Sequence, residues 1–482
     1  IARESVAKKE AGPAIEIGAE RQLFIDDYLV ASMQGLKRTL HQPKDIENNP
    51  VMLPEHPWEH RRIPFGSVIY SAKEKKFRCW YLVMNIYDSR PGFRGYRKDH
   101  HVPLHEAAFL CYAESADGVH WEKPELGLQE FRGSKKNNIL LTCPGSHFDS
   151  TSVVHTPDDE ERPWKMFSFI GRWPYKDDLI KKQWGEDFRF GVKHAAHYAW
   201  SSKDGIHWAP MNGGKPVLRA SDRSMFWWDA DKKIYVAAVK TSYQKKRAQL
   251  YGWSRDAVSW TRTSTWINRT DGLDNPGDQG EAAYGFKYGG QYVGFCEMRQ
   301  LRKGKPVKIV WELMTSRDGR NWSRPIRELF SPDGSKESWR YQVHKIFANP
   351  PIEQDGKLLI YYGGKTGMVP VEKGNKPFQA LCLAKLRKDG FVSLDAGSSA
   401  GSVTTKPFKL PAGKLHLNVD ASHGEVHAIL LDSDGQPIAQ SKAVRGDQLQ
   451  ATVSFDKPIA AGQVVSLKLM LRNCRLYAIW FA

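Results

Sequence analysis

The sequence predicts an all-β protein, with a five-bladed β-propeller followed by a small C-terminal β-sandwich. Three features carry this prediction: a turn sequence that recurs, a strand–turn–strand pattern before each copy, and a run of alternating strands after Val403. A unit that repeats every few tens of residues indicates a repeat architecture, and strands within the unit indicate propeller blades.

The recurring turn has the pattern Ser-x-Asp-Gly-x-x-Trp. It occurs at residues 115–121, 202–208 and 316–322, with Ala in place of Gly at 254–260 and a weaker echo at 387–391. The successive Asp residues are 87, 52, 62 and 71 positions apart. We expect the Asp to cap backbone N–H groups, the Gly to take a positive φ, and the Trp to pack the two outer strands of a blade together. One copy would be an ordinary hairpin, whereas five copies predict five blades.

Before each turn the chain alternates polar and apolar residues and is rich in aromatic ones, which favours strands over helices. Every predicted blade has a first strand, a short turn, an aromatic-rich second strand and a third strand. These strands are expected at 63–70, 76–84 and 107–113; 150–155, 164–171 and 197–201; 224–229, 233–241 and 249–254; 282–288, 291–297 and 309–316; and 344–350, 357–363 and 380–386.

The chain is expected to divide into three parts. Residues 1–58 form a leader and a Pro-rich extended segment that packs on the propeller, residues 59–405 form the propeller, and residues 406–482 form the sandwich. Insertions at 85–106 and 172–194 are rich in Arg, His, Trp and Tyr. Long loops on a rigid scaffold often carry binding residues, with surface decoration as the alternative.

The 482 residues carry a formal net charge of +17, which favours an acidic partner over a merely soluble basic surface. The basic residues are scattered and accompany no nucleic-acid motif, so we expect no nucleic acid partner.

No apolar run of about 18 residues is present, and no membrane association is expected. The six cysteines form no CxxC pair and predict buried free thiols. We expect no metal and no cofactor, and the oligomeric state stays open.

Candidate functional residues come from the propeller geometry. The innermost strand of each blade starts near the central axis, so residues at these starts converge. They include Arg61 and Arg62 before blade one, Asp149 in blade two, Asp222 and Arg223 in blade three, Asp278 and Glu281 in blade four, and His344 in blade five. Each acid alone could be a turn cap. Their shared register in three successive blades indicates a site, because core positions would be apolar.

Five blades with Asp149, Asp222 and Glu281 on consecutive inner strands resemble the five-bladed β-propeller glycoside hydrolases. This group holds the arabinanase/xylosidase, fructosidase and anhydrogalactosidase families, and the resemblance spans about residues 15–405. It implies that Asp149 is the general base or nucleophile, that Asp222 orients and tunes its neighbours, and that Glu281 is the general acid. His344 is the alternative acid.

Glycoside cleavage requires one protonated and one ionised carboxyl on opposite faces of the sugar. The Asp149 and Glu281 carboxyls are expected about 5–5.5 Å apart for retention of configuration or about 6.5–9.5 Å apart for inversion, which a wide funnel favours. Arg61, Arg62 and Arg223 suit bidentate pairing with sulfate or carboxylate. The other expected substrate contacts are His147, Asp278, Glu297 and Trp173, the last by stacking on a sugar.

The leading hypothesis is a secreted or periplasmic, exo-acting glycosidase for an anionic polysaccharide, although no targeting segment is visible in the sequence. Two alternatives stay open: a glycan-binding propeller without catalysis, and a glycoside phosphorylase whose basic funnel holds phosphate. The C-terminal sandwich shows no catalytic constellation and is expected to pack on the propeller or to hold glycan.

Overall fold

The structure is a computed structural model that describes residues 13–84, 106, 108–142, 148–171, 196–302, 305–330, 335–341, 345–368 and 377–482. The chain forms two compact units. The sandwich unit comprises Ile1–Gln42, Lys287–Tyr292 and Leu386–Ala482, and the propeller unit comprises Pro43–Phe286 and Val293–Lys385.

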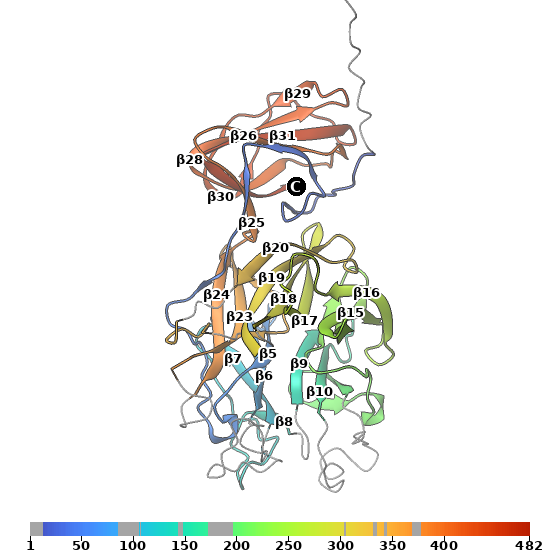
Figure 1. Ribbon diagram of the computed structural model, residues 1–482, viewed down its shortest axis with the longest axis vertical. Helices are drawn as coiled ribbons and strands as arrows, with labels where there is room; N and C mark the ends of the chain where they lie inside the picture. The colour runs from blue at the N-terminus through green and yellow to red at the C-terminus, as the bar shows by residue number, and fades with distance from the viewer. Residues whose placement is uncertain are drawn as a thin grey trace, which may run out of the picture. The chain divides into compact units, whose positions relative to one another are not determined.

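The propeller unit consists of five antiparallel sheets, one per blade, which confirms the predicted fold class (Figure 1). Blade one is β5 (Phe65–Ser71), β6 (Lys76–Met84), β7 (Ala108–Ser115) and β8 (Ile139–Thr142). Blade two is β9 (Phe148–His155), β10 (Trp164–Ile170), β11 (Ala196–Ser202) and β12 (Trp208–Pro210). Blade three is β13 (Met225–Asp229), β14 (Ile234–Tyr243), β15 (Lys246–Ser254) and β16 (Thr261–Asn268). Blade four is β17 (Gln279–Tyr288), β18 (Gln291–Arg302), β19 (Lys305–Ser316) and β20 (Ser323–Phe330).

Blade five joins segments from distant parts of the sequence. Its order is β21 (Lys345–Ile346), β23 (Lys357–Lys365), β24 (Gln379–Arg387) and β4 (Lys44–Asp45), with β22 (Ile352–Gln354) added on β23. The outer strand β4 comes from the Pro-rich segment that the sequence predicts to be an extended connection. Pairing of Lys44 with Lys385 and of Asp45 with Ala384 therefore closes the ring. Among the described residues, the short 3-10 helices η1 (Pro57–Glu59) and η3 (Asn212–Gly214) lie in connections.

Alternation along the second strand of blade one shows how the blades pack. Trp80, Leu82 and Met84 share a core cluster with blade two. Phe77 and Tyr81 share another with blade five. Successive side chains of a strand point to opposite faces, so a strand buried on both faces reads as a continuous apolar run.

The recurring turns follow the third strand of each blade. In the four complete copies the Asp Oδ1 accepts the backbone N–H groups two and three residues later, at 2.7–2.9 Å. Gly118, Gly205 and Gly319 have φ between 67° and 77°, and Ala257 has φ 64° in the degenerate copy. The predicted Asp cap and positive φ are therefore present.

The tryptophans of these turns differ from expectation because they also pack between blades. The Trp121 ring lies 6.0 Å from Tyr361 of blade five, and the Trp260 ring lies 5.6 Å from Phe167 of blade two. The turn backbone takes part as well, since Trp80 Nε1 donates to the Gly205 carbonyl at 2.6 Å. Each of these turns therefore packs against the preceding blade. The turn sequence alone does not reveal this contact, because its partners lie elsewhere in the chain.

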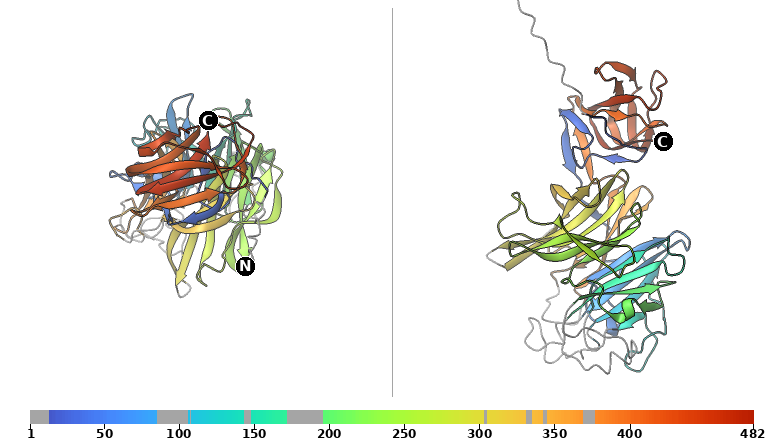
Figure 2. Two further views of the ribbon diagram at one scale, coloured as in Figure 1. Left: turned by 90° about the horizontal axis from the view of Figure 1, so that it is seen from above. Right: turned by 90° about the vertical axis from the view of Figure 1, so that its right-hand side faces the viewer.

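The sandwich unit is organised around the long strand β28 (Leu415–Leu431), which pairs with four other strands. N-terminal strands complete it: β1 pairs with β32, β2 with β26 and β3 with β25, so the blue segment lies among orange and red strands in Figure 2. The other strands are β1 (Gln22–Leu23), β2 (Val30–Gln34), β3 (Lys37–Leu40), β25 (Val392–Ala396), β26 (Gly401–Thr405), β27 (Phe408–Lys409), β29 (Pro437–Gln440), β30 (Val444–Thr452), β31 (Val464–Arg472) and β32 (Cys474–Phe481).

This division differs from the boundaries expected after residues 58 and 405. Segment 22–40 and strands β25 and β26 belong to the sandwich unit because their ladder partners lie there. The fifth turn also belongs to it: Asp389 is fully buried and accepts hydrogen bonds from Arg21 and Asn418. The insertions at 85–106 and 172–194 lie almost wholly outside the described residues.

The cysteines agree with the prediction of buried free thiols where the structure describes them. Cys79, Cys111, Cys296, Cys382 and Cys474 are buried free thiols, and Cys143 lies outside the described residues. No helix among the described residues is long and apolar enough to cross a membrane.

Candidate active site

The inner strands of blades two and three begin with strained backbone. Ser150 in β9 has φ 51°, and Arg223, two residues before β13, has φ 59°. Neither residue is a glycine, and left-handed φ values in such residues persist where the surrounding structure requires them. A hydrogen bond joins the two, since the Arg223 backbone N–H donates to Ser150 Oγ at 3.0 Å. Ser150 Oγ in turn donates to Asp149 Oδ1 at 2.5 Å. These two hydrogen bonds therefore link Asp149 to the Arg223 backbone through Ser150.

Glu281 lies in β17 and is surrounded by cations. Arg247 Nη1 lies 2.7 Å from Glu281 Oε2, and Arg299 Nε lies 3.4 Å from the same oxygen. Lys240 Nζ lies 3.5 Å from Glu281 Oε1 and 2.9 Å from Asp222 Oδ1. One buried lysine therefore pairs with two of the predicted catalytic carboxylates, Asp222 in the segment before β13 and Glu281 in β17 of the adjacent blade.

These cations set the charge state of Glu281. Burial by itself would raise the pKa of the Glu281 carboxyl, but Lys345, Lys240, Arg299 and Arg247 together hold that pKa well below its ordinary value. Burial likewise works to raise the pKa of Asp222, but its pair with Lys240 lowers it. Both carboxyls are therefore ionised at neutral pH.

A second fully buried carboxylate, Glu297 of β18, lies beside this group. Its Oε1 accepts from Arg223 Nη2 at 2.5 Å and from the Ile346 backbone N–H at 2.8 Å. Its Oε2 lies 3.3 Å from Lys345 Nζ. Burial lowers the pKa of Lys345, partly opposed by Glu297. The network thus extends from blade two to the start of blade five.

The hydrogen bonds and ion pairs above join the predicted residues into two groups, Asp149 with Arg223 and Glu297, and Asp222 with Glu281. The two groups adjoin where Asp222 precedes Arg223 in the chain. Asp278 is buried and accepts from the backbone and side chain of Asn275, as a loop cap does. The guanidinium groups of Arg61 and Arg62 lie 5.1 and 5.8 Å from the Phe378 ring. His147, Trp173 and His344 lie outside the described residues.

Sequence reasoning missed four residues: Lys240 in β14, Arg247 in β15, Arg299 in β18 and Lys345 in β21. The starts of inner strands do not indicate these residues, because three of them lie on the second and third strands of their blades. Only Lys240 could have been found from the sequence, because it directly follows the apolar run Tyr235–Val239, which the structure buries. A lysine there requires a buried anionic partner.

His197 of β11 supports the loop that carries Asp222. Its Nε2 lies 3.0 Å from the Ser221 carbonyl, and burial lowers its pKa to about 4. It is therefore neutral at pH 7, and this contact makes it a donor through Nε2.

Taken together, these ion pairs join five cations to three carboxylates among the described residues, a surplus of positive charge. Solvent reaches this cluster, since the side chains of Asp222 and Arg247 are 41% and 38% exposed. The arrangement can bind an anionic group and hold ionised carboxylates near it.

Comparisons with known proteins give a distant likeness in fold. No protein-family model and no curated protein match the chain. Similar solved structures include a glycoside hydrolase family 43 arabinoxylan arabinofuranohydrolase from Bacillus subtilis, with 12% identity, TM-score 0.40, and coverage of 91% of this chain and 98% of that one. A second is the GH32 β-fructofuranosidase of Bombyx mori, with 13% identity, TM-score 0.43, and coverage of 88% and 95%. A third is a glycosyl hydrolase from Bacteroides ovatus, with 13% identity, TM-score 0.43, and coverage of 72% and 94%. At this level of identity and TM-score the likeness concerns the fold alone, and the functional argument rests on the site residues.

Proposed function

We propose that this chain is a glycoside hydrolase, exo-acting on an anionic polysaccharide or oligosaccharide that carries sulfate or uronic groups. The observation that carries the proposal is the pair of ionised carboxylates Asp222 and Glu281 from consecutive blades, paired with buried Lys240 and with the partly exposed Arg247 and Arg299. Carboxylates supply the acid–base chemistry of glycoside cleavage, and arginine and lysine supply recognition of an acidic substituent. Because a polymer of this kind is met outside the cell, we place the enzyme in the periplasm or in the secreted fraction.

The charge states divide the roles among the carboxyls. Asp149, partly exposed and held by Ser150, is proposed as the general base. Asp222, paired with Lys240, orients and tunes the group. A general acid must carry a proton near neutral pH, and the four cations around Glu281 remove that proton. We therefore assign Glu281 the role of an ionised carboxylate that stabilises positive charge on the sugar, and the proton-donor role to His344.

The deciding experiment is product analysis against a panel of sulfated, uronic and neutral polysaccharides. Release of a short saccharide from an acidic polymer, and little from its neutral counterpart, is the expected result. Its rate should fall as ionic strength rises, because salt screens exposed charges. The Asp149→Asn variant should lose several orders of magnitude in turnover while the substrate still binds. An active Asp149→Asn variant would remove the assignment.

One observation favours a second candidate function, a glycoside phosphorylase. The surplus of cations over carboxylates in the cluster would also hold inorganic phosphate as the attacking group. Cleavage that requires phosphate and releases a sugar phosphate would establish this alternative. Binding to the same polymers with no product under either condition would establish a non-catalytic glycan-binding protein.

A further inference from the structure

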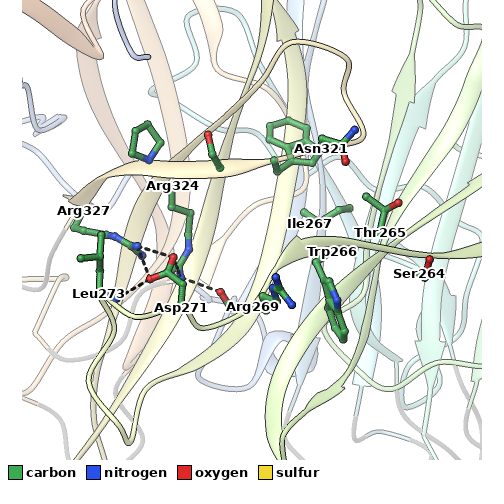
Figure 3. A pocket seen from close by; sticks show the side chains of 13 residues that line it. Ser264, Thr265, Trp266, Ile267, Arg269, Asp271, Leu273, Asn321, Arg324 and Arg327 are labelled. Carbon is green, nitrogen blue, oxygen red and sulfur yellow. Dashed lines mark hydrogen bonds and ion pairs between the residues drawn. The ribbon is translucent and has the colours of Figure 1, made fainter. Parts of the chain in front are cut away.

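The propeller unit contains a groove of about 580 Å³ that shares no residue with the candidate active site. It lies between the outer strands of two neighbouring blades, β16 of blade three and β20 of blade four, and Figure 3 shows its lining side chains. Its volume falls within the range of about 300–1,000 Å³ found for small-molecule sites.

One wall of the groove is a closed network of ion pairs. Arg327 Nη2 donates to both Asp271 oxygens at 2.9 and 2.8 Å, and Arg324 Nη2 donates to Asp274 at 2.5 Å. Both arginines also donate to Glu312 Oε2, at 2.6 and 2.9 Å. Arg324 is only 4% exposed, so this network fixes the loop from Arg269 to Asp274 against β20. The wall is preorganised and its charges are paired with one another.

The opposite side presents an aromatic surface with a cation on it. The Trp266 ring packs edge-on against Tyr243, with centroids 5.0 Å apart. The Arg269 guanidinium lies 5.0 Å from the Tyr243 centroid and 5.9 Å from the Trp266 centroid. Figure 3 shows Trp266 and Arg269 side by side. Arg269 is exposed and forms no ion pair with a described residue, unlike the other charged residues of the lining.

The rim adds hydrogen-bonding and apolar groups. Ser264 and Ser323 are exposed there, as is Asn321, whose side-chain amide also donates to Asp318 of the recurring turn at 2.7 Å. Leu273 lies at the end of the groove near Arg327 and Asp271 and is 80% exposed (Figure 3). An aromatic face, hydroxyl and amide groups and a single unpaired guanidinium together match a sugar ring that bears an acidic substituent.

We propose that this groove is a second carbohydrate-binding site, which holds a segment of an acidic saccharide chain by stacking on Trp266 and by pairing its carboxylate or sulfate with Arg269. The inference rests on the proposed function for the class of ligand, and it adds a site that holds the polymer but performs no chemistry. It predicts that the groove contributes to the use of long chains and is dispensable for short ones.

The test is affinity electrophoresis in gels that contain polygalacturonate, alginate or a sulfated galactan, with a neutral galactan for comparison. Asp149→Asn serves as the background, so that polymer is not consumed. Wild-type grooves should retard migration in at least one acidic gel. Ser264→Trp, which fills the groove from an exposed position, and Trp266→Ala should each weaken that retardation at least tenfold. Arg269→Gln should weaken it in acidic gels and leave any retardation by neutral galactan unchanged.

Matched controls are Arg262→Gln, an exposed arginine on the same strand but outside the lining, and Tyr70→Ala, an exposed aromatic residue of blade one. Both should migrate as the background does. With an active enzyme, Ser264→Trp should lower turnover of the polymer and leave cleavage of a short oligosaccharide unchanged. The proposal is overturned if neither Ser264→Trp nor Arg269→Gln weakens the retardation, or if no acidic gel retards the background variant. Groove-dependent retardation without hydrolysis would overturn only the proposed catalysis.

Discussion

Two buried glutamates of the propeller unit, Glu59 and Glu281, are held in opposite ways. Glu59 is fully buried, and each of its oxygens has well-formed hydrogen bonds: Tyr81 donates at 2.5 Å, Lys123 at 2.8 Å, and the backbone N–H groups of Glu55 and His56 at 2.7 and 2.9 Å. A single lysine lies within 3 Å of the carboxylate. Glu281 instead faces several cations at 2.7–3.5 Å, and two of these, Arg247 and Arg299, reach solvent.

The difference distinguishes a carboxylate whose charge the protein itself balances from one that we propose to be functional. The Glu59 network is closed, because Asn138 also donates to Tyr81 and accepts from Trp58, and every charge in it has a protein partner. The Glu281 cluster has more positive charge than its own carboxylates neutralise, as expected where a ligand completes the balance. Burial of a charge therefore says little by itself, and the balance of charges around it says more.

The largest expected effect is on catalysis. Glu281→Gln should lower turnover roughly 10²–10³-fold, the usual loss when one preorganised electrostatic group is removed from a site. Glu59→Gln should leave turnover per folded molecule unchanged. Steady-state rates, normalised to folded protein by near-UV circular dichroism, provide the measurement. Equal losses in both variants would break the distinction between the two glutamates.

The next effect is on the free energy of unfolding, and here Glu59→Gln should have the larger effect and Glu281→Gln the smaller one. Glu59→Gln removes the nearer carboxylate of buried Lys123 and leaves only the exposed Glu55, 3.6 Å away, so the loss should lie toward the lower end of the about 3–5 kcal/mol that breaking a buried pair costs. Glu281→Gln should cost less, because Arg247 and Arg299 can turn toward solvent. Thermal unfolding of both variants gives the comparison. The double variant Glu59→Leu, Lys123→Met should recover part of the loss, since an apolar pair replaces a buried ion pair with little penalty.

A pH series sharpens the same comparison. The folded pKa of Glu281 is depressed, so its stabilising contribution is present above the unfolded value of about 4.5 and is lost as the pH falls below that value toward the folded pKa. Between pH 6 and pH 3 the difference in melting temperature between wild type and Glu281→Gln should therefore shrink. A difference that grows on acidification would mean that Glu281 is protonated in the folded state.

The smallest effect concerns the turns that hold the blades together. A Cβ on Gly205 would lie 2.8 Å from Trp80 Cζ2 and would sit at φ 74°, so Gly205→Ala should cost about 1–3 kcal/mol by overpacking. At the equivalent position Ala257 already tolerates φ 64°, and Ala257→Gly should change stability by less than about 1 kcal/mol, because relief of strain offsets the loss of a buried methyl group. Chemical denaturation of the two variants measures both effects.

The sequence by itself determined the architecture of the propeller. Each turn is held by hydrogen bonds between residues two or three positions apart, and each strand is read from alternation along a few residues, so both signals are local. The same repeat predicts Asp149, Asp222 and Glu281 at the starts of consecutive inner strands. In the structure Asp149 and Glu281 lie within β9 and β17, whereas Asp222 precedes β13. The outer strand β4 was not recognised, because only two residues of a Pro-rich segment form it and its partner lies about 340 positions away.

The tertiary structure alone decided the charge state of the site. Lys240, Arg247, Arg299 and Lys345 come from different strands of blades three, four and five, and none belongs to a motif that includes Glu281. A pKa depends on distances in space, and the repeat carries no information about which side chains of second and third strands point inward. For this reason the sequence assigned Glu281 the role of the acid, whereas the cations around it favour an ionised carboxylate.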